Sequence, residues 1–216
     1  MDLPDSPNVH KPQQPRSIET LNKVLKACDA LLNDRTFEQI SMQDIAREAG
    51  VSVGNLYNRF RDRESLIEFI IERHQQEFLK SMKETLDKRH GSLSLSERVS
   101  ILGDTFRGGL NNLKPVFATI VMRRLNDSPQ SAGSRETTDT ITELAATWLC
   151  KSGNEIIGNK NKKSRFAVAS MAFGLQFDLL VGTGTRLFGD DYLTEAKIQA
   201  YQYLTNGRKP GSSKTR

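Results

Sequence analysis

The amino-acid sequence predicts an all-α protein of about nine helices, in which a three-helix N-terminal domain precedes a larger helical domain. The strong hydrophobic patterns repeat with the period of an α-helix, and no stretch alternates apolar and polar residues between hairpin signals, as paired strands do. At 216 residues, the chain is long enough to bury a core as one large domain or two small ones.

The N-terminal part of the chain carries the strongest local signals. Residues 1–15 hold four of the seven prolines and few apolar side chains, which predicts a disordered arm. A helix is expected from about Arg16 to Asn33, because apolar residues recur along one stripe. Ser41 and Ser52 are natural N-caps of two short helices, and Gly50 between them supplies the left-handed backbone of a tight turn. This layout is that of a helix-turn-helix.

The predicted domains follow from this layout. The helix-turn-helix domain comprises residues 16–62, the larger domain residues 63–205, and a basic flexible tail residues 206–216. Helices of the larger domain are predicted at about Asp62–His90, Leu95–Leu113, Val116–Leu125, Thr137–Lys151, Ala167–Val181 and Thr194–Leu204, with Pro115 closing the second of them.

The segment Ala167–Val181 is the most apolar part of the chain, with Ser170, Gln176 and Asp178 as its polar residues. Its length of about fifteen residues is less than the roughly 20 that a membrane span needs, so no membrane partner is expected. We instead expect a helix with its own core on one side and a second subunit on the other. The predicted dimerisation residues are Ala167, Ser170, Met171, Gly174, Leu175, Asp178 and Tyr201.

The charge pattern leans toward nucleic acid without proving it. The formal net charge is +5. Within Arg16–Ser65, however, eight basic residues are balanced by eight acidic ones. DNA affinity would then depend on the local cluster Arg59, Arg61 and Arg63, since phosphate neutralisation depends on which face the charges occupy.

No enzyme active site, cofactor or metal site is predicted. Gly182–Gly189 superficially suggests a phosphate loop, but it follows an apolar helix rather than a strand and lacks a lysine-serine pair. The three histidines are scattered, and there is neither a nucleophile elbow nor a convincing carboxylate pair. Cys28 and Cys150 are expected to be thiols, with Cys28 a small buried hydrophobe. The N-terminus lacks the apolar middle of a signal peptide, so a cytoplasmic location is expected.

The helix-turn-helix segment also matches a more specific pattern. The matching positions are Phe37, Ile40, Ser41, Ile45, Ala46, Ala49, Gly50, Val51, Ser52, Leu56, Tyr57, Phe60 and Leu66. They fall where the tetracycline-repressor (TetR) family of bacterial transcription regulators has its signature, which the chain resembles without a gap over about fifty residues. Beyond about residue 75 the resemblance is only architectural.

The resemblance implies a homodimer on near-palindromic double-stranded DNA, with the helix Ser52–Phe60 in the major groove and the last two long helices forming a four-helix dimer interface. It implies base contacts from Gln43, Val53, Asn55 and Arg59, and phosphate contacts from Ser52, Tyr57 and Arg63. Arg59 stands where histidine or tyrosine is usual, and Arg63 where lysine is commonest. The full set of predicted DNA-binding residues is Gln43, Ser52, Val53, Gly54, Asn55, Tyr57, Asn58, Arg59, Arg61 and Arg63.

Physical chemistry supports several of these roles independently. Asn55 can pair bidentately with adenine, which is worth about 1–3 kcal/mol of discrimination. Gly54 removes a side chain where a helix must approach DNA closely, and the Tyr57 hydroxyl is long enough to reach a backbone oxygen. The alternatives are that Tyr57 is a packed surface aromatic residue and that Arg61 is a solvated charge.

The larger domain is expected to hold an unknown, apolar small-molecule effector. Aromatic and methionine side chains at helical spacing could line its cavity, although such residues more often form plain core. The predicted effector-binding residues are His74, Phe106, Leu110, Phe117, Met122, Trp148, Met171, Phe173 and Phe177. Among them, His74 would be a polar group facing the domain interior rather than a metal ligand.

Together these features favour a sequence-specific, dimeric transcriptional repressor that leaves DNA when the effector tilts the long helix beginning near Asp62. The neutral charge balance keeps an alternative open. The chain would then be a helical protein-interaction module, or an effector-independent protein that binds DNA weakly.

Overall fold

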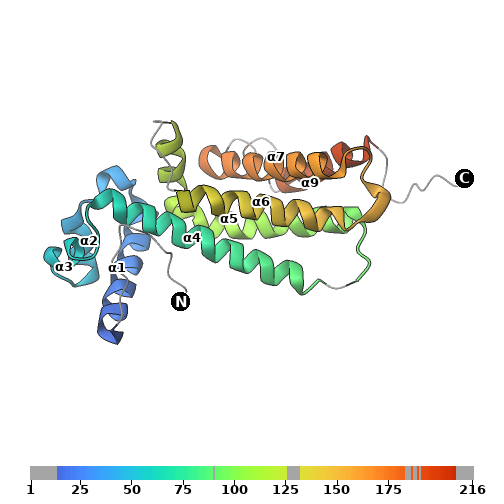
Figure 1. Ribbon diagram of the computed structural model, residues 1–216. Coiled ribbons are helices and arrows are strands. Elements are labelled where there is room, and N and C mark those ends of the chain that lie inside the picture. Colours follow the sequence, from blue (N-terminus) through green and yellow to red (C-terminus); the bar gives the residue numbers. More distant parts are fainter. Residues whose placement is uncertain are drawn as a thin grey trace, which may run out of the picture. The chain divides into compact units, whose positions relative to one another are not determined.

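The computed structural model describes residues 14–89, 91–125, 132–182, 186, 189 and 191–207. Within these residues the regular structure is entirely helical, with eight α-helices and two short 3-10 helices (Figure 1). The predicted all-α class is therefore confirmed. The predicted arm and tail lie almost wholly outside the described residues.

The chain divides into two compact units. Unit 1 comprises Met1–Glu77 and Leu113–Thr137, and unit 2 comprises Phe78–Asn112 and Thr138–Arg216. The helices that contribute to both units are α4 (Arg63–Asp87), α5 (Leu95–Leu125) and α6 (Ala132–Cys150). This division does not coincide with the domain boundary predicted after residue 62, because unit 1 includes α4 as far as Glu77.

Unit 1 begins with the layout that the sequence predicts. Its first elements are α1 (Pro15–Asp34), η1 (Phe37–Gln39), α2 (Met42–Ala49) and α3 (Val53–Tyr57), followed by the first part of α4. Pro15 occupies the first turn of α1, where its missing N–H costs no hydrogen bond. The core of these helices includes Leu21, Val24, Leu25, Cys28, Ile45, Ala46, Leu56, Phe60, Ile67 and Ile70.

Cys28 is a buried free thiol in this core. Burial, aided by the negative charge of Asp29, raises the pKa of the Cys28 thiol to about 12. The prediction that Cys28 is a small buried hydrophobe is confirmed.

The helix α5 differs from the prediction of two helices separated by Pro115. The structure has one helix of 31 residues, which continues through the proline. A proline inside a helix removes one backbone hydrogen bond and crowds the preceding turn, at a cost of about 3 kcal/mol. Val116, Phe117 and Ile120 directly after it are buried. Because burying each such side chain contributes roughly 1.5–3 kcal/mol, packing offsets the proline and the helix continues.

Unit 2 contains the remaining elements, which are η2 (Gly153–Glu155), α7 (Lys160–Val181) and α9 (Asp191–Thr205). The helices α7 and α9 lie side by side (Figure 1). Three helices begin several residues before the positions predicted for them: α6, α7 and α9. For α7 the reason is an unrecognised cap, since the side chain of Asn159 accepts a hydrogen bond from the backbone N–H of Lys162 at 3.0 Å.

The helix α7 is buried along one side only. Its interior side consists of Ser164, Ala167, Val168, Met171, Leu175 and Asp178, as expected for a core-facing side. Its exposed apolar residues are Phe166, Phe173, Phe177, Leu180 and Val181. By length and composition alone, α7 is the one helix of the described chain that could cross a membrane, but core helices of soluble proteins pass the same test. A second subunit on the exposed side stays a prediction.

We predict that Gly109 of α5 is required for packing against α4. A Cβ atom at this position would overlap the ring of Phe78, which is buried. We expect Gly109→Ala to lower the free energy of unfolding by about 1–3 kcal/mol, because overpacking forces side chains and backbone to shift. Chemical denaturation of the purified variant measures this change.

The neighbouring residue provides the matched control. A Cβ at Gly108 would meet no atom within 4 Å. Gly108→Ala is therefore expected to raise stability by roughly 0.5–1 kcal/mol, the helix advantage of alanine over glycine. Similar stability for the two variants would contradict the packing explanation.

Candidate nucleic-acid interface

A reciprocal capping box fixes the start of α2. Ser41 Oγ accepts a hydrogen bond from the Asp44 backbone N–H at 3.1 Å, and the Ser41 backbone N–H donates to Asp44 Oδ2 at 3.0 Å. Hydrogen bonds from Ser41 hold the pKa of the Asp44 carboxyl below its usual value. The predicted N-cap is confirmed, and it leaves Gln43 exposed on the first turn of the helix.

Gly50 reverses the chain between α2 and α3. Its φ of 66° lies in the left-handed region, which glycine adopts without a steric penalty. The Val51 backbone N–H donates to the Ala46 carbonyl at 3.0 Å, which closes the end of α2. Ser52 then caps α3 by accepting from the Asn55 backbone N–H at 3.2 Å, as predicted.

The short helix α3 presents polar groups to solvent above a buried anchor. Leu56 and Phe60 are 1% and 0% exposed, so the orientation of the helix is set by its apolar side. Val53 is half-buried. Tyr57 is 50% exposed, which argues against the alternative of a packed aromatic residue. The other predicted contact residues that are exposed here are Ser52, Gly54, Asn55 and Asn58.

The three arginines of the predicted cluster differ in what they contact. Arg59 Nη2 donates to Ser17 of α1, at 2.5 Å to Oγ and 3.3 Å to the carbonyl oxygen, and burial lowers the pKa of its guanidinium. Arg63 lies over the Phe37 ring, 4.5 Å from its centroid, and donates to the Ile40 carbonyl at 3.2 Å. Arg61 is exposed and pairs with the adjacent Asp62 at 2.9 Å. Two of the three therefore support the fold of unit 1.

Asp62 caps the start of α4. Its Oδ1 accepts hydrogen bonds from the Ser65 hydroxyl at 2.6 Å and from the Ser65 backbone N–H at 2.7 Å. These bonds, with a further one from Arg61, lower the pKa of the Asp62 carboxyl to about 2. The cap sets the point at which the chain leaves α3 and enters the long helix.

The predicted effector-binding residues are divided between the two units and between buried and exposed positions. Phe106, Leu110, Trp148 and Met171 are buried in unit 2, whereas Phe117 is buried in unit 1. Phe173 and Phe177 form an exposed stacked pair, with ring centroids 6.4 Å apart. His74 is paired with Asp29 in unit 1, and the side chain of Met122 lies outside the described part. Helical spacing identified several core residues, but it could not show which positions are exposed or which residues share a cavity.

The predicted dimerisation residues also separate into two groups. Ala167, Met171, Leu175 and Asp178 are buried in the single chain and face the interior of unit 2. Ser170 is exposed, and Gly174 and Tyr201 are half-buried. The exposed aromatic residues of α7, Phe166, Phe173 and Phe177, were not among the predicted dimerisation residues, although their spacing of seven and four residues is the signal of a helix face.

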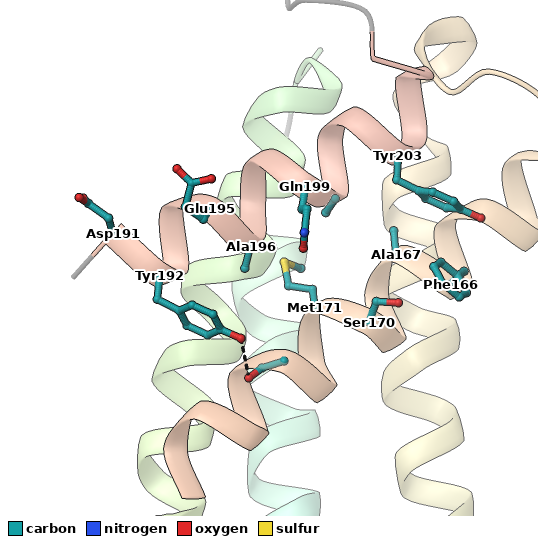
Figure 2. Close-up of a pocket in the computed structure, with 12 residues that line it drawn as sticks. Phe166, Ala167, Ser170, Met171, Asp191, Tyr192, Glu195, Ala196, Gln199 and Tyr203 are labelled. Atoms are coloured by element: carbon teal, nitrogen blue, oxygen red, sulfur yellow. Dashed lines mark hydrogen bonds between the residues drawn. The ribbon is translucent and has the colours of Figure 1, made fainter. Parts of the chain in front are cut away.

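A groove of about 800 Å³ lies between α7 and α9 (Figure 2). Tyr192 crosses it and donates a hydrogen bond from its hydroxyl to the Gly174 carbonyl at 3.1 Å. A Cβ on Gly174 would lie 3.2 Å from that hydroxyl, so glycine permits the close approach. Asp191 and Glu195 lie at the same end of the groove, and Met171 is the one predicted effector residue that lines it. The sequence pattern of α9 did not indicate this groove.

Within the described ranges, no group of three or more histidine, cysteine, aspartate or glutamate side chains is arranged to hold a metal ion. The arrangement in unit 1 is instead a short exposed helix with amide and hydroxyl side chains, placed after a capped turn. Such groups hydrogen-bond to base edges and to phosphate oxygens.

Comparison with known proteins identifies the same segment. Residues 24–70 match the family of bacterial regulatory proteins known as the tetR family. An HTH-type transcriptional regulator of Staphylococcus aureus strain bovine RF122 / ET3-1 is 31% identical over 74 residues, which cover 34% of this chain and 40% of that protein. One from strain USA300 is 28% identical over 79 residues, 37% of this chain and 43% of that protein. The chain thus spans less than half the length of these relatives.

Solved structures share the fold over most of the chain. A tetR-family transcriptional regulator from Streptomyces coelicolor has a TM-score of 0.67 at 15% identity, covering 88% of this chain and 82% of that one. The fatty acid degradation regulator FadR from Bacillus halodurans has a TM-score of 0.62 at 14% identity, covering 92% and 99%. FadR from Bacillus subtilis, solved in complex with stearoyl-CoA, has a TM-score of 0.62 at 15% identity, covering 88% and 100%. At these identities the likeness shows the fold alone.

The Asp62 cap predicts a pH-dependent contribution to stability. We expect Asp62→Ala to lower the free energy of unfolding at pH 7 by about 0.5–2 kcal/mol, the usual value of an N-cap. Because the folded pKa is about 2, below the ordinary value of 3.8, the contribution is complete above about pH 4 and is lost as the pH falls toward 2. Denaturant titrations at pH 7, 4 and 3 measure the difference between variant and wild type.

Asp87→Ala is the control for this experiment, because Asp87 is exposed at the opposite end of the same helix. An acid at a helix C-terminus is unfavourable, so this variant should be as stable as wild type or slightly more stable. If Asp62→Ala differed from wild type by the same amount at pH 3 as at pH 7, the cap would not be the cause.

Proposed function

We propose that the protein is a dimeric, sequence-specific transcriptional repressor of the tetR family, because residues 24–70 match the model of that family of bacterial regulatory proteins. A small-molecule effector lowers its affinity for DNA. The family's regulators are generally not enzymes, and we assign no catalytic role to this chain. It acts on DNA in the cytoplasm.

The observation that carries this proposal is the geometry of α3. The Ser52 cap holds its start, and the burial of Leu56 and Phe60 holds its end. The amide and hydroxyl groups of Ser52, Asn55, Tyr57 and Asn58 are then exposed. A short rigid helix of this kind can enter the major groove with its N-terminal residues against the base edges.

Roles can be assigned to the exposed residues by their chemistry. The Asn55 and Gln43 amides can pair bidentately with adenine, and Val53 can contact a thymine methyl group. Ser52, Tyr57 and Arg61 can bind phosphate oxygens. Base reading by Arg59 stays a prediction. To contact guanine, Arg59 would exchange its hydrogen bonds to the neutral Ser17 oxygens for hydrogen bonds to the base. Gly54 leaves room for the DNA backbone, and Asn58 lies beside the predicted contacts.

For Arg63 we propose a structural role beside the phosphate contact that the resemblance implies. Its guanidinium holds the ring of Phe37 and the carbonyl of Ile40. We propose that its main contribution is to position the segment before α2, and that any phosphate contact is secondary. The segment in turn carries the Ser41 cap.

We place the dimer contact on the exposed side of α7 and α9. Several large apolar residues exposed on two neighbouring helices are unusual on a monomer and mark an interaction site. The exposed large apolar residues of these two helices are Phe166, Phe173, Phe177, Leu180, Val181, Ile198 and Tyr203. Two copies are needed because the half-sites of a near-palindromic operator lie about 34–36 Å apart on one face of DNA.

The effector is proposed to be an apolar small molecule held in unit 2. Support comes from the aromatic core around Phe106 and Trp148, and from the B. subtilis FadR, a protein of the same fold that was solved with stearoyl-CoA. Binding would tilt α4, one of the helices that contribute to both units. A shift of a few ångströms in the spacing of the two α3 helices is enough to weaken simultaneous binding.

One observation favours a second candidate function. The charges of residues 16–65 cancel, and Arg59 and Arg63 are engaged within unit 1. A helical protein-interaction module, or an effector-independent protein with weak DNA affinity, would have the same features. Selection of bound fragments from random DNA separates the candidates, since only the repressor should enrich one near-palindromic sequence.

We predict that Asn55 discriminates between bases in the selected sequence. Asn55→Ala should weaken binding to that sequence by about 1–3 kcal/mol and relax the preference at one position in each half-site. Fluorescence anisotropy on the selected fragment and on single-base variants measures both effects. Asn33→Ala, which removes an exposed amide at the end of α1, is the control and should bind as wild type does. A uniform loss of affinity on all sequences would contradict base reading by Asn55.

We predict that Phe173→Glu converts the dimer to a monomer. Phe173 is 68% exposed in the single chain, so a charge there costs little until a partner buries it. Sedimentation velocity should show the monomer mass, and operator affinity should fall because one half-site is lost. Ile18→Glu is the control, because Ile18 is also exposed but lies on α1 of unit 1. A Phe173→Glu variant that remains dimeric would show that the dimer interface lies elsewhere on the protein.

A further inference from the structure

A buried polar cluster joins α1 to α4 within unit 1. We call Asp29, Arg73 and His74 the α1–α4 latch. Arg73 Nη2 donates to both oxygens of the Asp29 carboxylate, at 2.8 and 2.7 Å. His74 Nε2 lies 3.0 Å from Asp29 Oδ1 and 2.9 Å from Arg73 Nη2. The side chains of Arg73, His74 and Asp29 are 6%, 10% and 30% exposed, so the latch is largely shielded from water.

Stabilisation of the folded state alone does not explain why these charged residues are buried. Taking a guanidinium out of water is costly, and the attraction to one carboxylate seldom exceeds that cost by much. Arg73 Nε is moreover buried without a hydrogen-bond partner. Burial acts to raise the pKa of the Asp29 carboxyl, but the hydrogen bonds from His74 and Arg73 outweigh it and leave the pKa lowered. The carboxylate is therefore charged, and the latch closed, at neutral pH.

The chemistry of the latch suits it to fixing the register of two helices. Around it, α1 and α4 contribute apolar residues such as Leu25, Cys28 and Ile70 to the core of unit 1. Hydrophobic contact is non-directional and tolerates sliding or rotation of one helix over another. The Asp29 carboxylate accepts from Arg73 and lies within hydrogen-bond distance of His74, and such contacts are directional, because hydrogen bonds weaken steeply with distance and angle.

The latch lies close to the point where α4 passes between the two units. His74 lies one helical turn before the point, between Glu77 and Phe78, where α4 passes from unit 1 to unit 2. The Glu77 carboxylate faces it from the same helix, with Oε2 4.0 Å from His74 Nδ1. A movement of α4 that starts in unit 2 therefore reaches the latch residues first when it is transmitted into unit 1.

We propose that Asp29 is the positioning residue that makes α1 follow α4, so that the helix-turn-helix and the long helix move as one body. This inference rests on the proposed function, in which α4 carries the response between effector and DNA. Without the latch, α4 would shift over the apolar core and leave α1, α2 and α3 in place. DNA binding would survive, whereas its coupling to unit 2 would be lost.

The coupling can be tested before the effector is known, because binding linkage is reciprocal. If the state of unit 2 alters DNA affinity, then DNA must alter the state of unit 2 by the same coupling free energy. The probe is the double-stranded fragment selected from random DNA by the wild-type protein. Hydrogen–deuterium exchange of the full-length dimer, with and without this fragment, reports on unit 1 through residues 42–57 and on unit 2 through residues 95–112 and 160–181.

For wild type we expect the fragment to protect residues 42–57 and to change exchange in unit 2. In Asp29→Asn, residues 42–57 should still be protected and the affinity should stay within about tenfold of wild type, while the change in unit 2 is lost. Glu19→Gln is the matched control, because Glu19 forms an exposed ion pair with Lys23 on the same helix. It removes the same charge and should keep the full response in unit 2.

The variant Asp29→Asn leaves Arg73 buried without its anion and could fail to fold. The double variant Asp29→Asn/Arg73→Met removes both charges, so that no buried ion is left without its partner, and it should show the same loss of response. The latch is overturned if either folded variant keeps the full DNA-induced change of exchange in unit 2, or if Glu19→Gln loses that change equally. Neither result would contradict the proposed repressor function. If the wild-type protein selects no DNA sequence, the proposed function is contradicted, and the proposed role of the latch is contradicted with it.

Discussion

The geometry of the candidate interface depends on the burial of Phe60. This residue follows α3 directly, is fully inaccessible to solvent and meets the ring of Phe69 of α4 edge-on, with centroids 5.7 Å apart. An aromatic pair of this kind contributes about 0.5–1.5 kcal/mol beyond the area that it buries. The helix α3 has only five residues, so burial of Leu56 and Phe60 fixes its rotation about its own axis. That rotation determines which residues face outward. The exposed amides and hydroxyls of α3 are a consequence of this anchor.

Charge has a different role in unit 1 from the one that a basic protein suggests. Two of the three clustered arginines hold the elements on which α3 rests, through contacts with Ser17 and with Phe37. Favourable interaction with phosphates would come from a small number of groups, so a single helix-turn-helix should bind weakly. If the proposed dimer forms through the apolar side of α7 and α9, that side matters to DNA binding as much as α3 does, since pairing two weakly binding helix-turn-helix units raises the effective affinity.

Two features of the long helices show how packing overrides local signals. Pro115 closes a helix by every local rule, yet α5 continues because the apolar residues after it are buried. In α7, uniform apolarity predicts two buried sides, and the single chain buries one. Composition reports how much apolar surface a helix carries, but not which neighbour covers each side. The division of that surface between core and partner is a property of the assembled fold.

The sequence by itself determined the all-α class, the first helix, both serine caps and the Gly50 turn of this protein. These features depend on residues within four positions of one another, where backbone geometry fixes which groups can meet. Only the tertiary structure decided the partners of the long polar side chains. Arg59 reaches Ser17, 42 residues away, and Arg73 reaches Asp29, 44 residues away. No local pattern encodes such contacts, because they arise from the packing of helices that the chain brings together only once it has folded.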